Sequence, residues 1–169
     1  MYYFISEINY SRLKNLNKNI SLIWRNKNKE TPIKTLIELR NFCNKNNKRL
    51  YINNNIKLAN KIKADGLYIS SYNKDLMLKS NKLKTKFKIL GSAHNLKEIK
   101  IKELQNVDEI FLSPLFKDKT NEHLDIYKYF NLRKTTKMKD ISLGGINKKN
   151  IKKLRLIKPF GFAGISYFE

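Results

Sequence analysis

Two basic side chains near residue 25 are spaced for binding an anion. Arg25 and Lys27 stand two residues apart at the end of the apolar run SLIWR, so on extended backbone both side chains point to the same side. A guanidinium fork and an ammonium that converge on one ligand suit a pyrophosphate. The alternative is that both are ordinary solvated residues of a lysine-rich surface.

A second group of residues could bind an anion through the backbone. The segment Gly144-Gly145-Ile146-Asn147 joins a predicted strand to a predicted helix. Glycines let N–H groups approach a phosphate at the positive end of a helix dipole. Gly164 and Ser166 are small residues at the end of the last predicted strand, and the two groups together favour a phosphate site. The glycine pair alone is equally compatible with a plain tight turn.

Ser92 and His94 end a further predicted strand. An imidazole titrates near neutral pH, so His94 is a candidate general acid or base, with capping or packing as the alternative. The single cysteine, Cys43, lies in an apolar helix stripe and is expected to pack in the core. One cysteine excludes an intramolecular disulfide and a cysteine-rich zinc cluster, and two histidines argue against a histidine metal site.

Short runs of β-branched and aromatic residues recur about every 20 residues and would position these groups. Each run is followed by a polar turn and a segment of helical period. Eight strands separated by helices predict parallel strands with right-handed crossovers, and eight strands close a (β/α)8 TIM barrel. The strand runs cover residues 2–6, 21–25, 49–53, 66–71, 88–92, 109–114, 140–145 and 161–168; helices are expected over 11–16, 31–45, 55–63, 74–80, 96–105, 125–134 and 149–158.

Cap residues mark the starts of several of these helices. Thr31 followed by Pro32 is a cap with proline at the first helical position, and Asn95 with Glu98 resembles a capping box. Asn147 is expected to cap the last helix.

The predicted barrel is compact, because 169 residues allow about 21 per unit, against roughly 250 residues for a typical barrel of this fold. We expect a single domain over residues 1–169 with a short first helix and no final helix, since the sequence ends directly after the last strand. A doubly wound open sheet is the structural alternative. Tyr167 and Phe168 would lie on an apolar flank that a second subunit could cover in a homo-oligomer.

Lys and Arg number 36 against 14 Asp and Glu, a net charge of +22, so nucleic acid binding has to be weighed. The 30 lysines outnumber the 6 arginines and are spread over nearly every segment, which is typical of codon bias at exposed positions. No zinc finger, helix-turn-helix or aromatic RNA-binding strand accompanies them. We therefore expect weak, salt-sensitive attraction to phosphates and no specific nucleic acid partner.

The sequence has no feature of a membrane or secreted protein. No apolar run approaches the roughly 20 residues that span a bilayer, and the first ten residues lack the pattern of a signal peptide. A cytoplasmic protein without a membrane partner is expected.

Five segments resemble the thiamine phosphate synthase and thiazole tautomerase (TenI-like) family of phosphate-binding barrels, over Ser21 to Ser166. LYINNNIKLANKIKADGLYIS has the asparagine that ends strand three and the Ala-Asp-Gly before strand four, and ILGSAHNLKEI has the Ser-x-His end of strand five. VDEIFLSPLFKDKT is similar to the family's Gly-Pro-x-Phe element, with Ser113 in place of glycine. SLGGINKKNI and FAGIS match its two phosphate motifs.

The resemblance implies a transferase that joins aminopyrimidine (hydroxymethylpyrimidine) pyrophosphate to thiazole phosphate, giving thiamine phosphate and pyrophosphate. Its partners would be small phosphorylated substrates. The implied site consists of Arg25, Lys27 and Asn53 on the pyrophosphate, Ser92 and His94 at the ring site, Thr120 as a further substrate contact, and Gly144, Gly145, Gly164, Ile165 and Ser166 on the thiazole phosphate.

The resemblance also implies Mg²⁺, which the family's synthases bind with two aspartates. Asn54 and Asn73 stand at those positions here, and Asp75 could substitute only if its loop shifts. An amide oxygen can ligate a hard cation but adds no negative charge, so weak Mg²⁺ binding is expected. Tyr68 and Asn121 replace a histidine and a lysine of the family pattern.

These departures leave several functions open. Arg25 and Lys27 favour the synthase, whereas the missing aspartates favour a thiazole tautomerase in which His94 would move a proton without metal or pyrophosphate. A phosphate-binding barrel that has lost catalysis is a third interpretation. A basic module that binds nucleic acid without specificity belongs to a different class.

Overall fold

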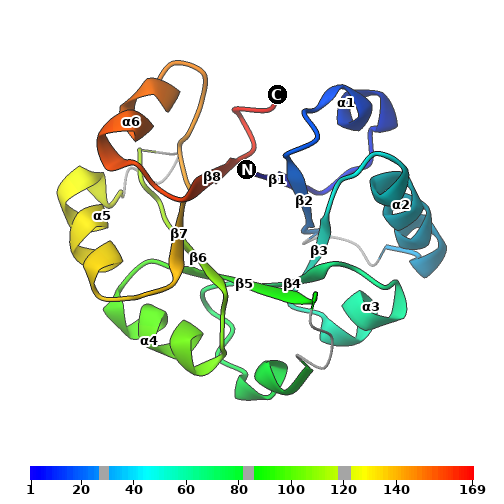
Figure 1. Cartoon of the computed structure of the whole chain (residues 1–169), viewed down its shortest axis with the longest axis horizontal. Coiled ribbons are helices and arrows are strands. Elements are labelled where there is room, and N and C mark those ends of the chain that lie inside the picture. The colour runs from blue at the N-terminus through cyan, green and yellow to red at the C-terminus, as the bar shows by residue number, and fades with distance from the viewer. Residues whose placement is uncertain (27–30, 82–85, 118–122) are drawn as a thin grey trace.

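Eight parallel strands close into a barrel in the computed structural model, which describes residues 1–26, 31–81, 86–117 and 123–169. Each strand pairs with the next along the chain, and β8 pairs with β1 (Figure 1). This closure confirms the predicted barrel and excludes an open sheet. The strands are β1 (Tyr2–Ile5), β2 (Ser21–Trp24), β3 (Leu50–Asn53), β4 (Gly66–Ile69), β5 (Lys88–Ala93), β6 (Glu109–Leu112), β7 (Lys139–Ser142) and β8 (Gly161–Gly164).

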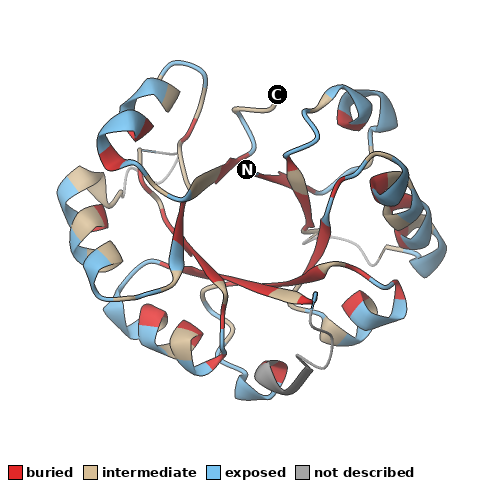
Figure 2. Ribbon diagram, viewed as in Figure 1, coloured by how far each residue is buried: buried red, intermediate tan, exposed pale blue. Residues whose placement is uncertain are grey.

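Helices surround the ring of strands, and their outer faces are exposed (Figure 2). The first helix has six residues, as expected, and residues 165–169 after β8 form a turn instead of a helix. The helices are α1 (Tyr10–Asn15), α2 (Ile33–Lys45), α3 (Ile56–Lys61), α4 (Leu96–Leu104), α5 (Asp125–Lys134) and α6 (Leu154–Ile157), with 3-10 helices η1 (Leu76–Asn81) and η2 (Ile151–Lys153).

Two expected helices differ from the prediction. Residues 74–80 were expected to be α-helical, but the segment forms η1, because Leu78 is its one buried apolar residue with a described side chain and provides too little packing for a longer helix. The expected helix over 149–158 is divided into η2 and the four-residue α6. It ends at Lys158, whose φ of 47° is left-handed and which precedes Pro159, a residue that disfavours helix before it.

The predicted caps are confirmed in part. The Asn95 side chain accepts a hydrogen bond from the N–H of Glu98 at 3.0 Å and begins α4. The prediction for Thr31 is wrong, because α2 begins after Pro32 and has no side-chain cap. Asn147 accepts from the turn that precedes η2, so it stabilises that turn and does not begin a helix.

Alternate strand residues fill the barrel interior, because side chains alternate along a strand. The N-terminal end of the barrel is closed by Glu109, which accepts a hydrogen bond from Tyr2 and pairs with Lys88. At the C-terminal end of the barrel, polar side chains follow the interior residues by two positions, because every second residue of a strand points to the same side. The interior cluster consists of Tyr2, Phe4, Ile23, Tyr51, Tyr68, Leu90, Phe111, Ile141 and Ala163.

The strands that close the barrel are covered by the turn after β8. The ring of Phe168 lies 5.1 Å from that of Tyr3, and the ring of Tyr167 lies 5.0 Å from that of Phe162. Tyr167 and Phe168 are thus half-buried within the chain itself, and oligomerisation through this flank stays a prediction. Cys43 is fully buried, as expected. None of the helices in the described ranges is long and apolar enough to cross a membrane.

Candidate active site

Arg25 lies at the C-terminal end of the barrel, at the edge of the interior. Its guanidinium carbon is 5.9 Å from the centre of the Phe4 ring, which contacts Tyr68 edge-on at 5.1 Å. Ser92 lies near Tyr68. Burial raises the pKa of Tyr68, whereas the neighbouring Ser92 and the charge of Arg25 oppose this rise. The barrel thus brings Arg25 and Ser92 to one region.

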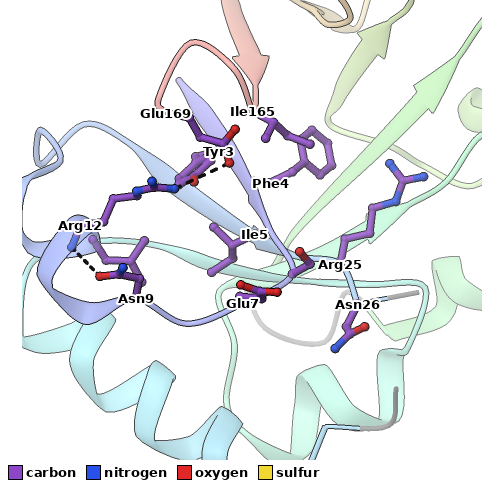
Figure 3. A pocket seen from close by; sticks show the side chains of 12 residues that line it. Tyr3, Phe4, Ile5, Glu7, Asn9, Arg12, Arg25, Asn26, Ile165 and Glu169 are labelled. Carbon is purple, nitrogen blue, oxygen red and sulfur yellow. Dashed lines mark hydrogen bonds and ion pairs between the residues drawn. The ribbon is translucent and has the colours of Figure 1, made fainter. Parts of the chain in front are cut away.

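A cavity of about 570 Å³ opens beside Arg25 (Figure 3). Arg25 reaches it from the end of β2, and Ile165 reaches it from the turn after β8. Glu7 and Asn26 also line it, and on its far side Arg12 pairs with Glu169 at 3.7 Å. A cation and a residue of the predicted phosphate loop therefore border the same space.

Asn53 ends β3 with its amide held in one orientation. The hydroxyl of Ser70 donates to Asn53 Oδ1 at 2.8 Å. The Nδ2 group of Asn53 donates to no acceptor in the part of the chain that the structure describes. An amide with its oxygen engaged and its nitrogen available suits an anionic ligand.

The residues at the predicted metal positions do not fit Mg²⁺. Asn54 Oδ1 accepts from the N–H of Ser70 at 2.9 Å and from Asn73 Nδ2 at 3.3 Å. Asn73 Oδ1 accepts from the N–H of Asp75, and the Asp75 carboxylate accepts from the N–H of Met77, both at 2.9 Å. Both amide oxygens are already engaged. Across the described ranges no three His, Cys, Asp or Glu side chains form a metal-binding group.

The two glycines after β7 are required by the loop after β6. Gly144 and Gly145 have φ values of 94° and 66°, which disfavour any residue with a Cβ. A Cβ on Gly144 would also lie 2.6 Å from Pro114, and one on Gly145 would lie 2.6 Å from the oxygen of Phe116. The glycine pair therefore allows close packing of two loops.

The loops after β7 and β8 lie next to each other, and the phosphate site expected there stays a prediction. A Cβ on Gly164 would be 3.7 Å from the carbonyl oxygen of Ile146. Within the described ranges, no acceptor takes the backbone N–H groups of Gly145 or Ser166. Backbone N–H groups at the ends of strands are suited to a phosphate where they converge.

His94 lies at the end of β5 and is held by Glu98. One oxygen of Glu98 accepts from the His94 backbone N–H at 2.7 Å and lies 2.9 Å from His94 Nδ1. The His94 side chain is 45% exposed, and it does not line the cavity beside Arg25. The Glu98 carboxylate therefore orients the imidazole through Nδ1, and Nε2 lies on the opposite edge of the ring.

Two of the predicted site residues, Lys27 and Thr120, lie outside the described residues. Sequence reasoning did not select Ser70 or Glu98 for the site. The signals that could have found them are regular spacings: Ser70 follows the interior Tyr68 by two strand positions, and Glu98 follows His94 by four residues.

A family model and individual relatives with known names point to the same family. Residues 13–168 match the model of the family described as thiamine monophosphate synthase. A thiamine-phosphate synthase from Prochlorococcus marinus is 32% identical over 138 residues, which are 75% of this chain and 39% of that protein. One from Pelagibacter ubique is 31% identical over 159 residues, 88% of this chain and 74% of that protein.

The fold has a similar counterpart among solved structures. A thiamine phosphate pyrophosphorylase from Pyrococcus furiosus superimposes with a TM-score of 0.77 at 18% identity, covering 98% of this chain and 85% of that one. The chain spans about two fifths of the length of its Prochlorococcus marinus relatives, 39% of one and 37% of another.

Proposed function

The chain belongs to the thiamine monophosphate synthase family, and from this premise we propose that it joins hydroxymethylpyrimidine pyrophosphate to thiazole phosphate, giving thiamine phosphate and pyrophosphate. The observation that carries the proposal is the shared cavity, which Arg25 borders from one side and Ile165 from the other. One substrate needs a pyrophosphate site and the other a phosphate site, and both sites have to border one cavity because the two substrates react with each other.

The chemistry needs little proton transfer. The bond between the pyrimidine methylene and the pyrophosphate oxygen breaks, and its electron pair leaves with the pyrophosphate. The thiazole nitrogen then forms the new C–N bond with the resulting carbocation. Catalysis therefore consists of stabilising the departing anion and aligning the nucleophile.

Arg25 and Asn53 are assigned to the departing pyrophosphate. The guanidinium is a fixed cation at the rim, and the Asn53 amide offers its nitrogen because Ser70 occupies its oxygen. Lys27 is assigned to the same anion by its position in the sequence. Charge-assisted hydrogen bonds are the strongest that a protein can direct at such an oxyanion.

The phosphate of the thiazole is assigned to the loops after β7 and β8. The backbone N–H groups of Gly145 and Ser166 are candidates to bind it, with Gly164 and Ile165 shaping the same turn. Ser92 would border the ring site, because it reaches the interior beside Tyr68. Thr120 is kept as a further substrate contact from the sequence.

The proposal assigns no step to Mg²⁺, although the resemblance implies it. The oxygens of Asn54 and Asn73 already accept hydrogen bonds from the chain, and neither side chain brings a charge. The charge of the pyrophosphate is instead assigned to protein donors.

The experiment is a product assay with purified protein and both substrates, read as thiamine phosphate by chromatography. Arg25→Ala is expected to lower the rate by about 100-fold, the usual cost of removing one donor to a developing oxyanion. Arg155→Ala, on the exposed face of α6, is the matched control and should retain the rate. Absence of product from high concentrations of wild-type protein would refute the synthase.

A thiazole tautomerase is the second candidate, and the pairing of His94 with Glu98 favours it. An imidazole held at Nδ1 by a carboxylate is suited to proton transfer through Nε2. In that case His94→Ala abolishes isomerisation of a carboxythiazole phosphate while binding of inorganic phosphate persists. Unchanged isomerisation in His94→Ala removes this histidine from catalysis.

A further inference from the structure

Lys102 is a buried lysine on the inner face of α4. Its side chain has 0% exposure and lies on the same buried face as Ile99. Gly91 of β5 makes room for it, because a Cβ at that position would lie 2.9 Å from Lys102 Cδ. The aliphatic part of the lysine thus crosses the outer surface of β5 and carries the ammonium toward the C-terminal end of β4.

The ammonium of Lys102 binds the backbone of the loop after β4. It donates to the carbonyl oxygens of Ser70 at 3.0 Å and Asn73 at 2.8 Å, and to the side-chain oxygen of Gln105 at 2.9 Å. Gln105 Nε2 donates to the carbonyls of Asn73 and Asp75, both at 3.0 Å. Lys102 of α4 and Gln105, which directly follows the helix, therefore hold three carbonyl groups of residues 70–75.

This arrangement is costly unless the ammonium contributes something specific. Burial lowers the pKa of Lys102 to about 8, and the charge of Glu98 acts in the opposite direction. An apolar side chain would pack between α4 and β5 without that desolvation cost. The ammonium differs from an apolar side chain in that it holds the backbone of the β4 loop in one position.

The held loop orients the rim amides. Ser70 donates through its backbone N–H to Asn54 and through its hydroxyl to Asn53. Asn73 donates from its side chain to Asn54, and Asn54 Nδ2 donates to the hydroxyl of Tyr72. Both amide oxygens thereby face the loop, so the position of the loop decides which amide atoms are left for a ligand.

We propose that Lys102 is a positioning residue for the pyrophosphate half of the site: it holds the β4 loop so that Ser70 and Asn73 orient the amides of Asn53 and Asn54. That pyrophosphate is the ligand of this half of the site rests on the proposed function. The loop clamp itself does not, because it is formed entirely by groups of the protein.

The test compares Lys102→Met with Lys48→Met in the full chain. Lys48 is also buried, and its ammonium donates to the carbonyls of Leu16 and Asn17, near the opposite end of the barrel. Both variants lose a buried ammonium that binds backbone carbonyls, so a general loss of stability affects both. Amide hydrogen exchange of residues 70–75 and calorimetric titration with inorganic pyrophosphate are measured on each.

Lys102→Met is expected to speed exchange in residues 70–75 and to weaken pyrophosphate binding by about tenfold, with Lys48→Met at the wild-type value for both. In the product assay the KM for the pyrophosphorylated substrate should rise about tenfold while the KM for thiazole phosphate stays constant. If Lys102→Met does not fold, Gln105→Leu, which removes the bonds to Lys102, Asn73 and Asp75, takes its place.

Unchanged exchange in residues 70–75 of a folded Lys102→Met overturns the proposal, as does equal weakening of pyrophosphate binding in both lysine variants. A wild-type protein that binds no pyrophosphate counts against the proposed function. In that outcome the exchange measurement still decides whether Lys102 holds the loop.

Discussion

Hydrogen bonds that occupy oxygen atoms decide which ligand the rim of this barrel can take. Asn53 and Asn54 both direct their amide oxygens to the β4 loop. An asparagine in this orientation offers N–H donors, which bind phosphate oxygens and repel a metal ion. Asn54 and Asn73 stand where the resembled family has aspartates; their amide groups already hydrogen-bond within the protein and bring no negative charge for a metal ion.

A double substitution tests this account of the metal positions. Asn54→Asp with Asn73→Asp should create saturable Mg²⁺ binding by calorimetry, because paired carboxylates bring the charge that amides lack. Wild-type protein should show none at the same millimolar concentrations. Asn41→Asp with Asn60→Asp, two exposed helical positions, provides the same change in net charge as a control. Equal Mg²⁺ binding by wild type and the first variant would contradict the interpretation.

The buried thiol of Cys43 makes a prediction about pH. Burial raises its pKa from 9.0 to about 12, so at pH 8.5 the folded protein should resist alkylation by iodoacetamide, and the urea-unfolded protein should react. Between pH 9 and 12 the unfolded thiol loses its proton and the folded thiol keeps it. The free energy of unfolding contributed by Cys43 is therefore complete below pH 9 and falls as the pH rises toward 12.

The measurement is urea unfolding of wild type and Cys43→Ala at pH 7.5 and 10. Cys43→Ala should be less stable at both pH values because of the cavity it leaves, and its stability should fall less between them. An identical pH dependence in the two proteins would show that the thiol titrates normally in the folded state.

At the scale of elements, the glycine that follows β7 and the glycine that ends β8 have different roles. Gly144 combines a left-handed backbone with a contact to Pro114 that leaves no space for a Cβ. Gly164 has ordinary van der Waals distances of 3.7 Å to its neighbours. The first glycine holds two loops together, and the second shapes the surface where the phosphate is proposed to bind.

Alanine at these two positions should therefore change the free energy of unfolding by different amounts. Gly144→Ala should lower the free energy of unfolding by about 2 kcal/mol or more, through backbone strain and overpacking. Gly164→Ala should change it by less than about 1 kcal/mol. Urea unfolding checks both values. A similar decrease in the free energy of unfolding for both variants would contradict the interpretation that only Gly144 lacks space for a Cβ.

The elements that the sequence predicts well are those whose pattern reflects local burial. All eight strands are confirmed, because each apolar run is bounded by turn residues and buried in the barrel. The segment 74–80 was predicted less well because a helix of its length depends on tertiary packing. Lys102 was missed because lysine in a basic chain normally indicates a solvated surface, and only its position beside Ile99 on the buried face of α4 signals otherwise.

The site was predictable where a residue follows from strand period alone. Arg25, Asn53 and Ser92 each stand two positions after an interior residue, so the closed barrel brings them to one rim. The orientation of the Asn53 and Asn54 amides was not predictable, because it depends on contacts with Ser70 and Asn73 from another loop. Sequence patterns report which face a residue occupies and say little about which of its atoms is free.

At the scale of the whole molecule, the two ends of the barrel differ. At the N-terminal end, the buried Glu109 pairs with the half-buried Lys88 and accepts a hydrogen bond from Tyr2. The cavity beside Arg25 opens at the other end, where the strands finish. The polar rim that carries Arg25 therefore lies at the end where the strands finish, and the net charge of +22 is a property of the surface as a whole.

The contrast between the rim and the rest of the surface predicts two kinds of anion binding, which should differ in how strongly their affinity depends on salt concentration. Random duplex DNA is attracted by scattered lysines, so its affinity should fall by about 10³ between 50 and 200 mM salt, as counterion release requires. Binding of inorganic pyrophosphate at the rim rests on directed donors such as Arg25, so it should saturate at one equivalent and weaken far less over that range. Calorimetry for pyrophosphate and anisotropy for DNA give the two slopes. Equal slopes, with Arg25→Ala altering neither affinity, would show that the surface charge alone attracts anions and that the rim selects none.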